Sequence, residues 1–425
     1  GVSVMQSEGE PGASISIRVR GGISITQSNE PLYVIDGFPS EDGMNSLDPA
    51  EIETIDILKD ASSTAIYGAR GANGVVVITT KKGAKDGGKI QLSFDSYIGI
   101  KRIARQLPVL STKEFVLLDY ERSLAFKGES GVTSFQQRYG SFRELDENYA
   151  NREGIDWQDE ALGRVTTSQN YRVNLTGGGK ELKYNFSYSY FKDLGAMVYS
   201  GSDKHNVSLS VSHNPNKRFR ANARFNYAQT KVYGMGTSGS TTNFNKMEHI
   251  IQYRPTVGIY GEDSDLLIGE DPLLEDDETN PMQSPLVSAA EETKKKLQRV
   301  LQVSGGFTFN FNKYLSFRNT IGFRYQDTFF GDESITGKRS SINGTIQYNE
   351  SGNFQTSNVL TYDNKGKKHK FTVMAGQEWV SNWSQYMRAR ADNFPNDDIG
   401  LDDMSLGVPR SIETGVNFDD RLLSF

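Results

Sequence analysis

The chain has 425 residues, including 20 Tyr, 23 Phe, 42 Gly, 12 Pro and no Cys, and its net charge is −6. This length suggests two or three domains, and the lack of Cys excludes disulfides and thiolate chemistry. The acidic balance argues against a nucleic-acid partner, which would favour a basic stripe.

The first 83 residues predict a small α+β unit. Asp48-Pro49-Ala50-Glu51 predicts a helix start, with Asp48 as N-cap and Pro49 in the first turn. A second short helix is expected to begin at Asp60 and to stop at Gly68. Short apolar runs between turn residues predict four strands, at Ile15–Val19, Leu32–Ile35, Ile52–Leu58 and 75–79.

After a linker at 84–88 the chain changes to a period-two alternation of apolar and polar residues. The runs exceed the ~5–6 residues usual in soluble sheets and suit the ~9–11 tilted residues that cross a bilayer. Their polar partners suit a wet interior, so the mean hydropathy of −0.54 does not exclude a membrane protein. The pattern predicts nine strands and the start of a tenth, at 90–100, 171–175, 184–190, 207–211, 219–227, 303–311, 315–325, 359–362, 371–379 and 421–425.

Short and long connections alternate between these strands. The short ones lie at 177–181, 214–217, 312–313 and 364–368, and the long ones at 101–168, 192–204, 231–296, 330–352 and 385–417. This rhythm predicts an antiparallel up-and-down β-barrel with short periplasmic turns and long extracellular loops. Ten strands would leave unpaired edges, which hydrocarbon does not tolerate, so we expect the sequence to be cut at its C-terminus. It also opens without a signal peptide.

Several segments of the first 83 residues stand in a characteristic order: 1–4 (GVSV), 16–21 (SIRVRG), 31–37 (PLYVIDG), 45–49 (NSLDP), 52–61 (IETIDILKDA) and 65–83 (AIYGARGANGVVVITTKKG). With these segments, residues 1–83 resemble the plug of the SusC/RagA class of TonB-dependent transporters of Bacteroidetes-type bacteria. Segment 156–160 (DWQDE), before the second barrel strand, is also similar to this class.

The resemblance implies a mainly β protein with a plug at 1–83, the linker at 84–88 and the N-terminal part of a barrel at 89–425. Such barrels close with about 22 strands. It implies active import of an oligosaccharide or peptide across the outer membrane, with plug displacement as the gate. The implied partners are a SusD-like surface lipoprotein, outer-membrane lipid and TonB, which would grip a segment upstream of Gly1. A receptor or adhesin without transport is the alternative.

Two groups of candidate site residues follow. Glycines 68, 71 and 74 lack the spacing of a phosphate-binding loop and are interpreted as tight turns. We expect a polar plug–barrel interface drawn from Arg18, Arg20, Gly21, Asp36, Gly37, Lys59, Asp60, Tyr67, Gly68, Arg70, Gly71, Asn73 and Gly74. A short helix is expected at 243–252, and the loop aromatics Tyr233, Phe244 and Tyr253 are candidate ligand contacts.

Enzymatic and metal-dependent functions find little support. The four His residues form no metal-spaced pair, and no Gly-x-Ser-x-Gly elbow is present. The acidic loop 262–278 offers carboxylates for Ca²⁺ but lacks EF-hand spacing, so a solvated loop is favoured. We expect neither an enzyme nor a cofactor, although a catalytic carboxylate pair in a glycan-cleaving β-protein stays open.

Overall fold

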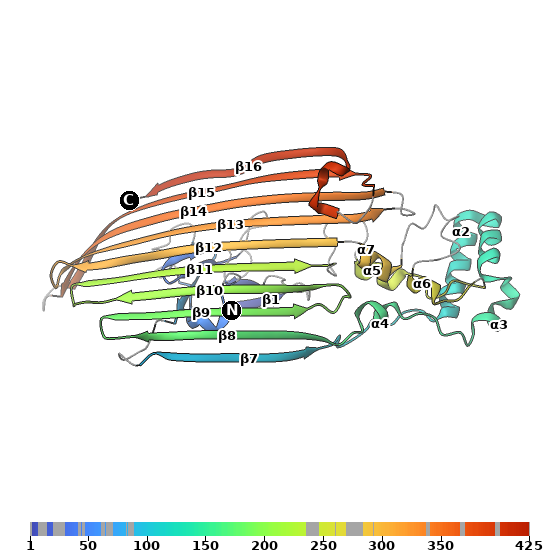
Figure 1. Cartoon of the computed structure of the whole chain (residues 1–425), viewed down its shortest axis with the longest axis horizontal. Helices are drawn as coiled ribbons and strands as arrows, with labels where there is room; N and C mark the ends of the chain where they lie inside the picture. The colour runs from blue at the N-terminus through green and yellow to red at the C-terminus, as the bar shows by residue number, and fades with distance from the viewer. Residues whose placement is uncertain are drawn as a thin grey trace.

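The chain folds into a long curved sheet, a small N-terminal domain on one face of the sheet, and a group of helices beyond one end of it (Figure 1). The computed structural model describes residues 2–6, 15–19, 30–40, 44, 47–60, 64, 71–81, 83, 89–234, 246–259, 261–268, 284–291, 293–336, 341–365, 370–395 and 400–424.

Ten strands of the described chain form the curved sheet, here called the wall. They lie in chain order and each pairs antiparallel with the next, which confirms the ten predicted strands and the up-and-down topology. The strands are β7 (Gln91–Lys101), β8 (Thr166–Gly178), β9 (Leu182–Leu194), β10 (Gly201–His213), β11 (Phe219–Tyr233), β12 (Thr293–Asn310), β13 (Leu315–Thr336), β14 (Ser341–Lys365), β15 (Lys370–Asp392) and β16 (Val408–Ser424).

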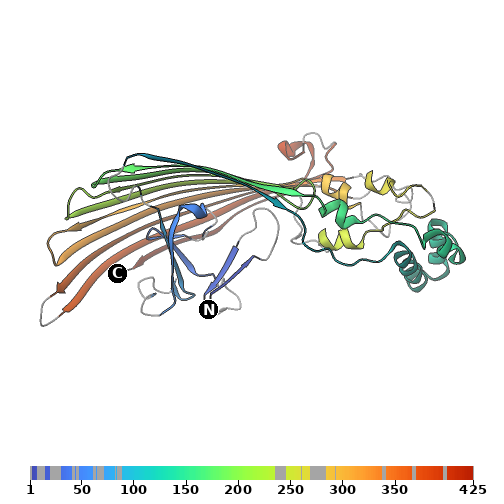
Figure 2. The same ribbon diagram turned by 90° about the horizontal axis from the view of Figure 1, so that it is seen from below.

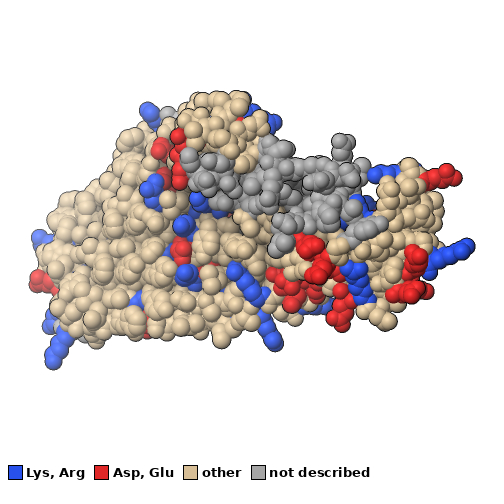
Figure 3. Space-filling model, turned by 45° about the vertical axis from the view of Figure 1, so that its right-hand side comes forward, with Lys and Arg blue, Asp and Glu red and all other residues tan. Residues whose placement is uncertain are grey.

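The outward, convex face of the wall carries the apolar half of the alternation. Across β9–β13 five large apolar residues pair in one register row and are 37–43% exposed: Phe186, Leu209, Phe225, Val303 and Phe323. Such a surface suits lipid, and the intervening polar residues face the concave side. In Figure 3 the visible outward face is mostly uncharged, and charged side chains gather toward the end that carries the helices.

Two long connections were predicted wrongly. Most of 330–352 is strand, because β13 continues to Thr336 and β14 begins at Ser341. Likewise β15 runs to Asp392 and β16 begins at Val408, within the predicted loop at 385–417. The ladder hydrogen bonds continue past the level where outward residues need to be apolar, so the alternation fades while the strands persist.

The N-terminal domain contains the four predicted strands. β1 (Val2–Gln6) pairs with β2 (Ile15–Val19), and a second sheet has the order β4-β3-β6-β5. Its strands are β3 (Leu32–Ile35), β4 (Phe38–Ser40), β5 (Ile52–Leu58) and β6 (Val75–Thr80). Their apolar side chains form one small core that includes Val19, Ile35, Leu47, Val76 and Ile78.

The predicted helix at Asp48 is a single 3-10 turn, η1 (Pro49–Glu51), whose N-cap Asp48 accepts a hydrogen bond from the Ala50 amide at 3.0 Å. It ends at once because Ile52 is extended and begins β5. Of the second predicted helix, Thr64 is helical and its amide donates to the Asp60 carbonyl at 3.0 Å. Residues 61–63 and 65–70 lie outside the described chain.

The helices gather into one group, here called the cap. Within the two longest connections lie α2 (Thr112–Tyr139), η3 (Phe142–Glu144), α3 (Leu145–Tyr149), α4 (Trp157–Leu162), α5 (Lys246–Gln252), α6 (Asp265–Ile268) and α7 (Pro285–Glu291). Helix α5 lies within the predicted segment 243–252. A last connection carries η4 (Gly400–Asp402) and η5 (Met404–Leu406). Among the described residues, no helix is long and apolar enough to cross a membrane.

Candidate functional site

The N-terminal domain lies against the concave face of the wall (Figure 2). Charged side chains make contacts between the two. Arg224 of β11 places Nη2 2.6 Å from Glu51 Oε2 and donates from Nη1 to Thr80 Oγ1 at 2.8 Å. Its Nη1 is also 3.8 Å from Asp36 Oδ2. Arg224 and Glu51 are only 6% and 4% exposed, so this ion pair is almost completely removed from water.

Local structure holds both carboxylates in place. Asp36 occupies the tight turn between β3 and β4 with φ of 51°, followed by Gly37 with φ of 90°, as a two-residue hairpin turn requires. Its carboxylate accepts hydrogen bonds from the Thr80 amide at 2.9 Å and the Thr80 hydroxyl at 2.5 Å. Glu51 ends η1 and accepts a bond from Ser208 Oγ at 2.6 Å. The two turns therefore present their carboxylates to one arginine.

A second ion pair lies beside the first. Arg172 of β8 donates from Nε and Nη2 to the two Asp48 oxygens at 2.9 and 2.5 Å. Burial alone would raise the pKa of Asp48, but hydrogen bonds from Arg172, the Ala50 amide and Ser189 outweigh it and lower this pKa. Lys204 Nζ donates to the Leu47 carbonyl at 3.3 Å. We call the contacts of Arg172, Lys204, Ser208 and Arg224 with the N-terminal domain the latch.

One apolar contact accompanies the latch. The Phe38 ring of β4 packs against Gly322 of β13, where an added Cβ would lie 1.9 Å from the ring. Only glycine fits there without displacing the ring. The wall thus receives an aromatic side chain of the plug at Gly322, beside a latch whose wall side chains are charged or carry a hydroxyl group.

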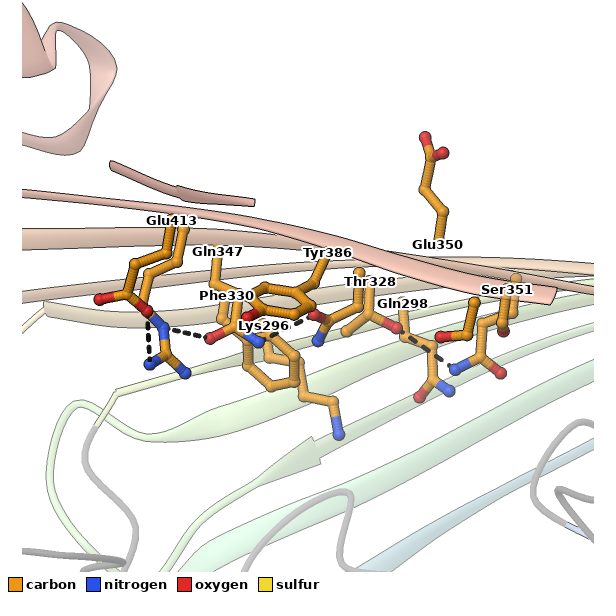
Figure 4. A pocket seen from close by; sticks show the side chains of 13 residues that line it. Lys296, Gln298, Thr328, Phe330, Gln347, Glu350, Ser351, Tyr386 and Glu413 are labelled. Atoms are coloured by element: carbon orange, nitrogen blue, oxygen red, sulfur yellow. Dashed lines mark hydrogen bonds and ion pairs between the residues drawn. The ribbon is translucent and has the colours of Figure 1, made fainter. Parts of the chain in front are cut away.

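A polar hollow of about 610 Å³ lies on the concave face of β12–β16, toward the cap (Figure 4). We call it the basin. Arg388 Nε donates to Gln347 Oε1 at 2.8 Å, and Lys296 Nζ lies 5.5 Å from the Phe330 ring centroid. Glu350 points away from the other labelled side chains. Further lining residues include Gln298, Gln326, Thr328, Asn349, Tyr386 and Glu413. Amide and cationic donors beside aromatic rings suit a polar ligand with hydroxyl or carbonyl groups.

Comparison with known proteins identifies the N-terminal domain. A family model described as TonB-dependent Receptor Plug Domain matches residues 1–75. TonB-dependent receptor P3 of Formosa agariphila is 28% identical over 96% of this chain and 38% of its own length. TonB-dependent receptor SusC of Bacteroides thetaiotaomicron is 34% identical over 56% of this chain and 23% of its own length. The N-terminal domain is a TonB-dependent receptor plug, and the chain as a whole is similar to receptors of the SusC/RagA class.

Solved structures support the same fold for this receptor. The RagAB peptide importer in its closed-closed state has a TM-score of 0.77 at 20% identity, covering 100% of this chain and 49% of that one. The ferric citrate transporter FecA has a TM-score of 0.51 at 12% identity, covering 99% and 47%. The receptor chain spans 38% and 41% of receptors P3 and P26 of Formosa agariphila. Its plug and barrel wall place it in the outer membrane.

The residues predicted for the plug–barrel interface do not all lie at that interface. Asp36 belongs to the latch, and a Cβ on neighbouring Gly37 would lie 3.7 Å from Arg318 Nη2 of the wall. Gly74 has φ of 94° and packs against Val19 inside the plug, with its amide bonded to the Gly71 carbonyl at 3.0 Å. Asn73 Nδ2 donates to the Glu30 carbonyl at 3.5 Å. Arg18, Lys59 and Asp60 are exposed on the plug. The positions outside the described chain are Arg20, Gly21, Tyr67, Gly68 and Arg70.

Of the three predicted loop aromatics, the structure describes Tyr233 and Tyr253. Tyr253 is 6% exposed in the cap core, with its ring edge-on to Trp157 at 5.1 Å, so it has little surface for a ligand. Tyr233 ends β11, and its hydroxyl lies 2.5 Å from where a Cβ of Gly201 would be. Phe244 lies outside the described chain, as do residues 269–278 of the acidic loop. In that loop Asp263 accepts two bonds from Arg152, at 2.7 and 2.9 Å.

Sequence reasoning did not single out the wall half of the latch. Arg172, Lys204 and Arg224 occupy inward positions of alternating strands, where many polar residues look equivalent. Glu51 and Asp48 were recognised only as parts of a helix start. One signal could have indicated these contacts: each of these strands carries a cationic side chain at an inward position, and the turns of the plug carry carboxylates that could pair with it.

Proposed function

We propose that the full-length receptor imports a large polar nutrient, an oligosaccharide or a peptide, across the outer membrane, with the plug as the gate. The observation that carries this proposal is the latch, a set of buried ionic and hydrogen-bonded contacts between the plug and the wall. The basin offers a place for the nutrient on the same concave face. A SusD-like lipoprotein would cover the extracellular side, and TonB would supply the pull on the plug.

The chemistry of the latch suits a gate better than an apolar interface would. Buried ion pairs hold their partners in one geometry, and removing one partner is costly. When the plug moves, however, water in the polar lumen can hydrate every group that the latch releases. An apolar interface would instead expose its whole surface to water at about 25 cal/mol per Å². A polar latch therefore holds the plug at rest without making its displacement prohibitive.

A reversible crosslink between plug and wall tests the gate. The chain has no Cys, so Phe38→Cys with Gly322→Cys introduces a single pair at a position where a side chain of β4 touches β13. In the full-length receptor, co-expressed with its lipoprotein, oxidation should abolish uptake of a labelled ligand taken from glycan and peptide libraries. Binding of that ligand should persist, and reduction should restore uptake.

The two single variants, Phe38→Cys and Gly322→Cys, are the controls for local damage, because neither can form the bond. Uptake that continues in the fully crosslinked receptor would overturn plug displacement as the gate. A further outcome is that the unsubstituted receptor and all variants bind the ligand without taking it up, even under reducing conditions. That result would favour the alternative of a receptor or adhesin without transport.

A further inference from the structure

The outward face of the wall contains a polar notch of about 440 Å³ across β8–β11. It is lined by Tyr171, Tyr188, Tyr190, Asp203, His205, Gln229 and Lys231. Register places these side chains outward: Tyr171 pairs with Tyr190, and Tyr190 with His205, in the same alternation as the apolar outward row. A polar hollow on the lipid side of the wall needs an explanation that the lumen and the plug do not supply.

The notch lies where the outward face stops being apolar. On β11 the outward residues Phe225 and Tyr227 are followed by Gln229 and Lys231 toward the cap. On β10, Leu209 and Val207 are likewise followed by His205 and Asp203. The apolar band of a membrane barrel ends at an interface rich in aromatic residues, so the notch is at the level of the outer-leaflet headgroups.

Hydrogen bonds fix the rings of the notch. The Tyr190 hydroxyl donates to Asp203 Oδ1 at 3.1 Å, and the Tyr188 hydroxyl is 3.0 Å from His205 Nδ1. The Tyr171 and Tyr190 rings are nearly parallel, with an interplanar angle of 11°. Fixed aromatic faces beside hydroxyl and carboxylate groups are suited to a sugar, whose C–H faces stack on rings while its hydroxyls bond to the polar rim.

The charges around the notch add a requirement for an anion. In the register row, Asp203 lies between Lys192 of β9 and Lys231 of β11. Neither lysine forms an ion pair with any described residue. An aromatic girdle that only anchored the barrel would not need a carboxylate, and Asp203 carries its charge at the edge of the bilayer with the Tyr190 hydroxyl as its hydrogen-bond donor. Two cations and one acid instead match a sugar that carries a phosphate.

We propose that this notch binds the headgroup of an outer-leaflet glycolipid, a phosphorylated saccharide whose acyl chains lie along the apolar outward row. The sugar stacks on Tyr171 and Tyr190 and donates hydroxyl hydrogen bonds to Asp203. Its phosphate lies between Lys192 and Lys231. The site is independent of the plug and of import, because all its residues face away from the lumen.

Native mass spectrometry of the full-length receptor tests this assignment. The probe is lipopolysaccharide in nanodiscs of phosphatidylethanolamine, compared with phosphatidylglycerol at the same fraction. Lys192→Gln with Lys231→Gln should weaken retention of lipopolysaccharide about 30-fold, from roughly 1 kcal/mol for each surface cation. The matched control is Lys180→Gln with Lys217→Gln, which removes two charges at the opposite ends of these strands, in the turns after β8 and β10.

Three results would overturn the proposal. The first is equal retention by the notch variant and the control variant. The second is equal retention of phosphatidylglycerol and lipopolysaccharide, which would show a general anion effect. The third is displacement by the deacylated saccharide phosphate at concentrations equal to those of the lipid, which would make the occupant a soluble sugar phosphate. Heat-modifiable migration on gels confirms that each variant has folded, and Asp203→Asn should by itself reduce the preference for lipopolysaccharide.

Discussion

Removing the central arginine of the latch should release the plug. Arg224→Met keeps the length of the side chain but leaves the carboxylate of Glu51, only 4% exposed, without its cation at 2.6 Å. Breaking a buried pair by removing one partner typically costs about 3–5 kcal/mol, because the other charge stays buried and unpaired. At about 1.4 kcal/mol for each tenfold change, the detached plug should become roughly 150-fold to several thousandfold more populated.

Hydrogen exchange of β3, β5 and β6 in the full-length receptor measures this population through the loss of amide protection. Arg220→Met is the control, because it removes the same charge from an exposed position of the same strand. Adding Glu51→Gln to Arg224→Met should cost less than the sum of the two single changes, since the stranded charge is then gone. If Arg224→Met changes plug protection no more than Arg220→Met does, the latch does not hold the plug.

Two other predictions concern acid and the cap. The pKa of Asp48 is lowered in the folded protein, so its contact with Arg172 stabilises docking above the ordinary value of 3.8 and is lost as the pH falls through the lower folded value. A fluorescent label on the plug should report constant docking from pH 7 to 5 and release of the plug below pH 3.8. The variant Asp48→Asn should dock more weakly at pH 7. Release of the plug near pH 5 in the unsubstituted protein would contradict this prediction. In the cap, Arg152→Leu removes bonds to Asp263 and to the Gly258 carbonyl, and should lower local stability by about 1–3 kcal/mol. Hydrogen exchange should show faster opening of 255–268, with Arg143→Leu as the exposed control; equal protection in both variants would refute the role of Arg152.

The period-two alternation predicted most of the wall because each strand contributes one residue to lipid and the next to the lumen. Phe225 and Arg224, adjacent in sequence, show the rule: one is outward and 39% exposed, and the other is 6% exposed against the plug. The rule fails above the bilayer. Asp327, Glu350 and Gln385 occupy outward positions of β13, β14 and β15, paired in one row, and a polar residue there looks like a loop.

The latch was harder to predict because its members are far apart in sequence. Arg224 and Glu51 are separated by 173 positions, and Arg172 and Asp48 by 124. Local patterns identify Asp48 as a helix cap and Asp36 as a turn residue, and both descriptions are correct. Neither local pattern indicates that the carboxylate also contacts an arginine of the wall, because that contact depends on how the plug docks. Such pairs follow from the tertiary structure alone.

Strand β13 links the plug to the basin. Its Gly322 receives the Phe38 ring, while Gln326, Thr328 and Phe330 of the same strand line the basin about 13–26 Å further on at ~3.3 Å per residue. The backbone between them is held by ladders to β12 and β14 on both sides, so a ligand cannot shift the strand without breaking main-chain hydrogen bonds. Side chains are less constrained. Gln326 accepts a bond from Arg324 and donates one to Thr328 at 3.3 Å on the concave face. Communication between an occupied basin and the plug must therefore run through such side-chain contacts, or through the ligand itself, rather than through movement of the wall.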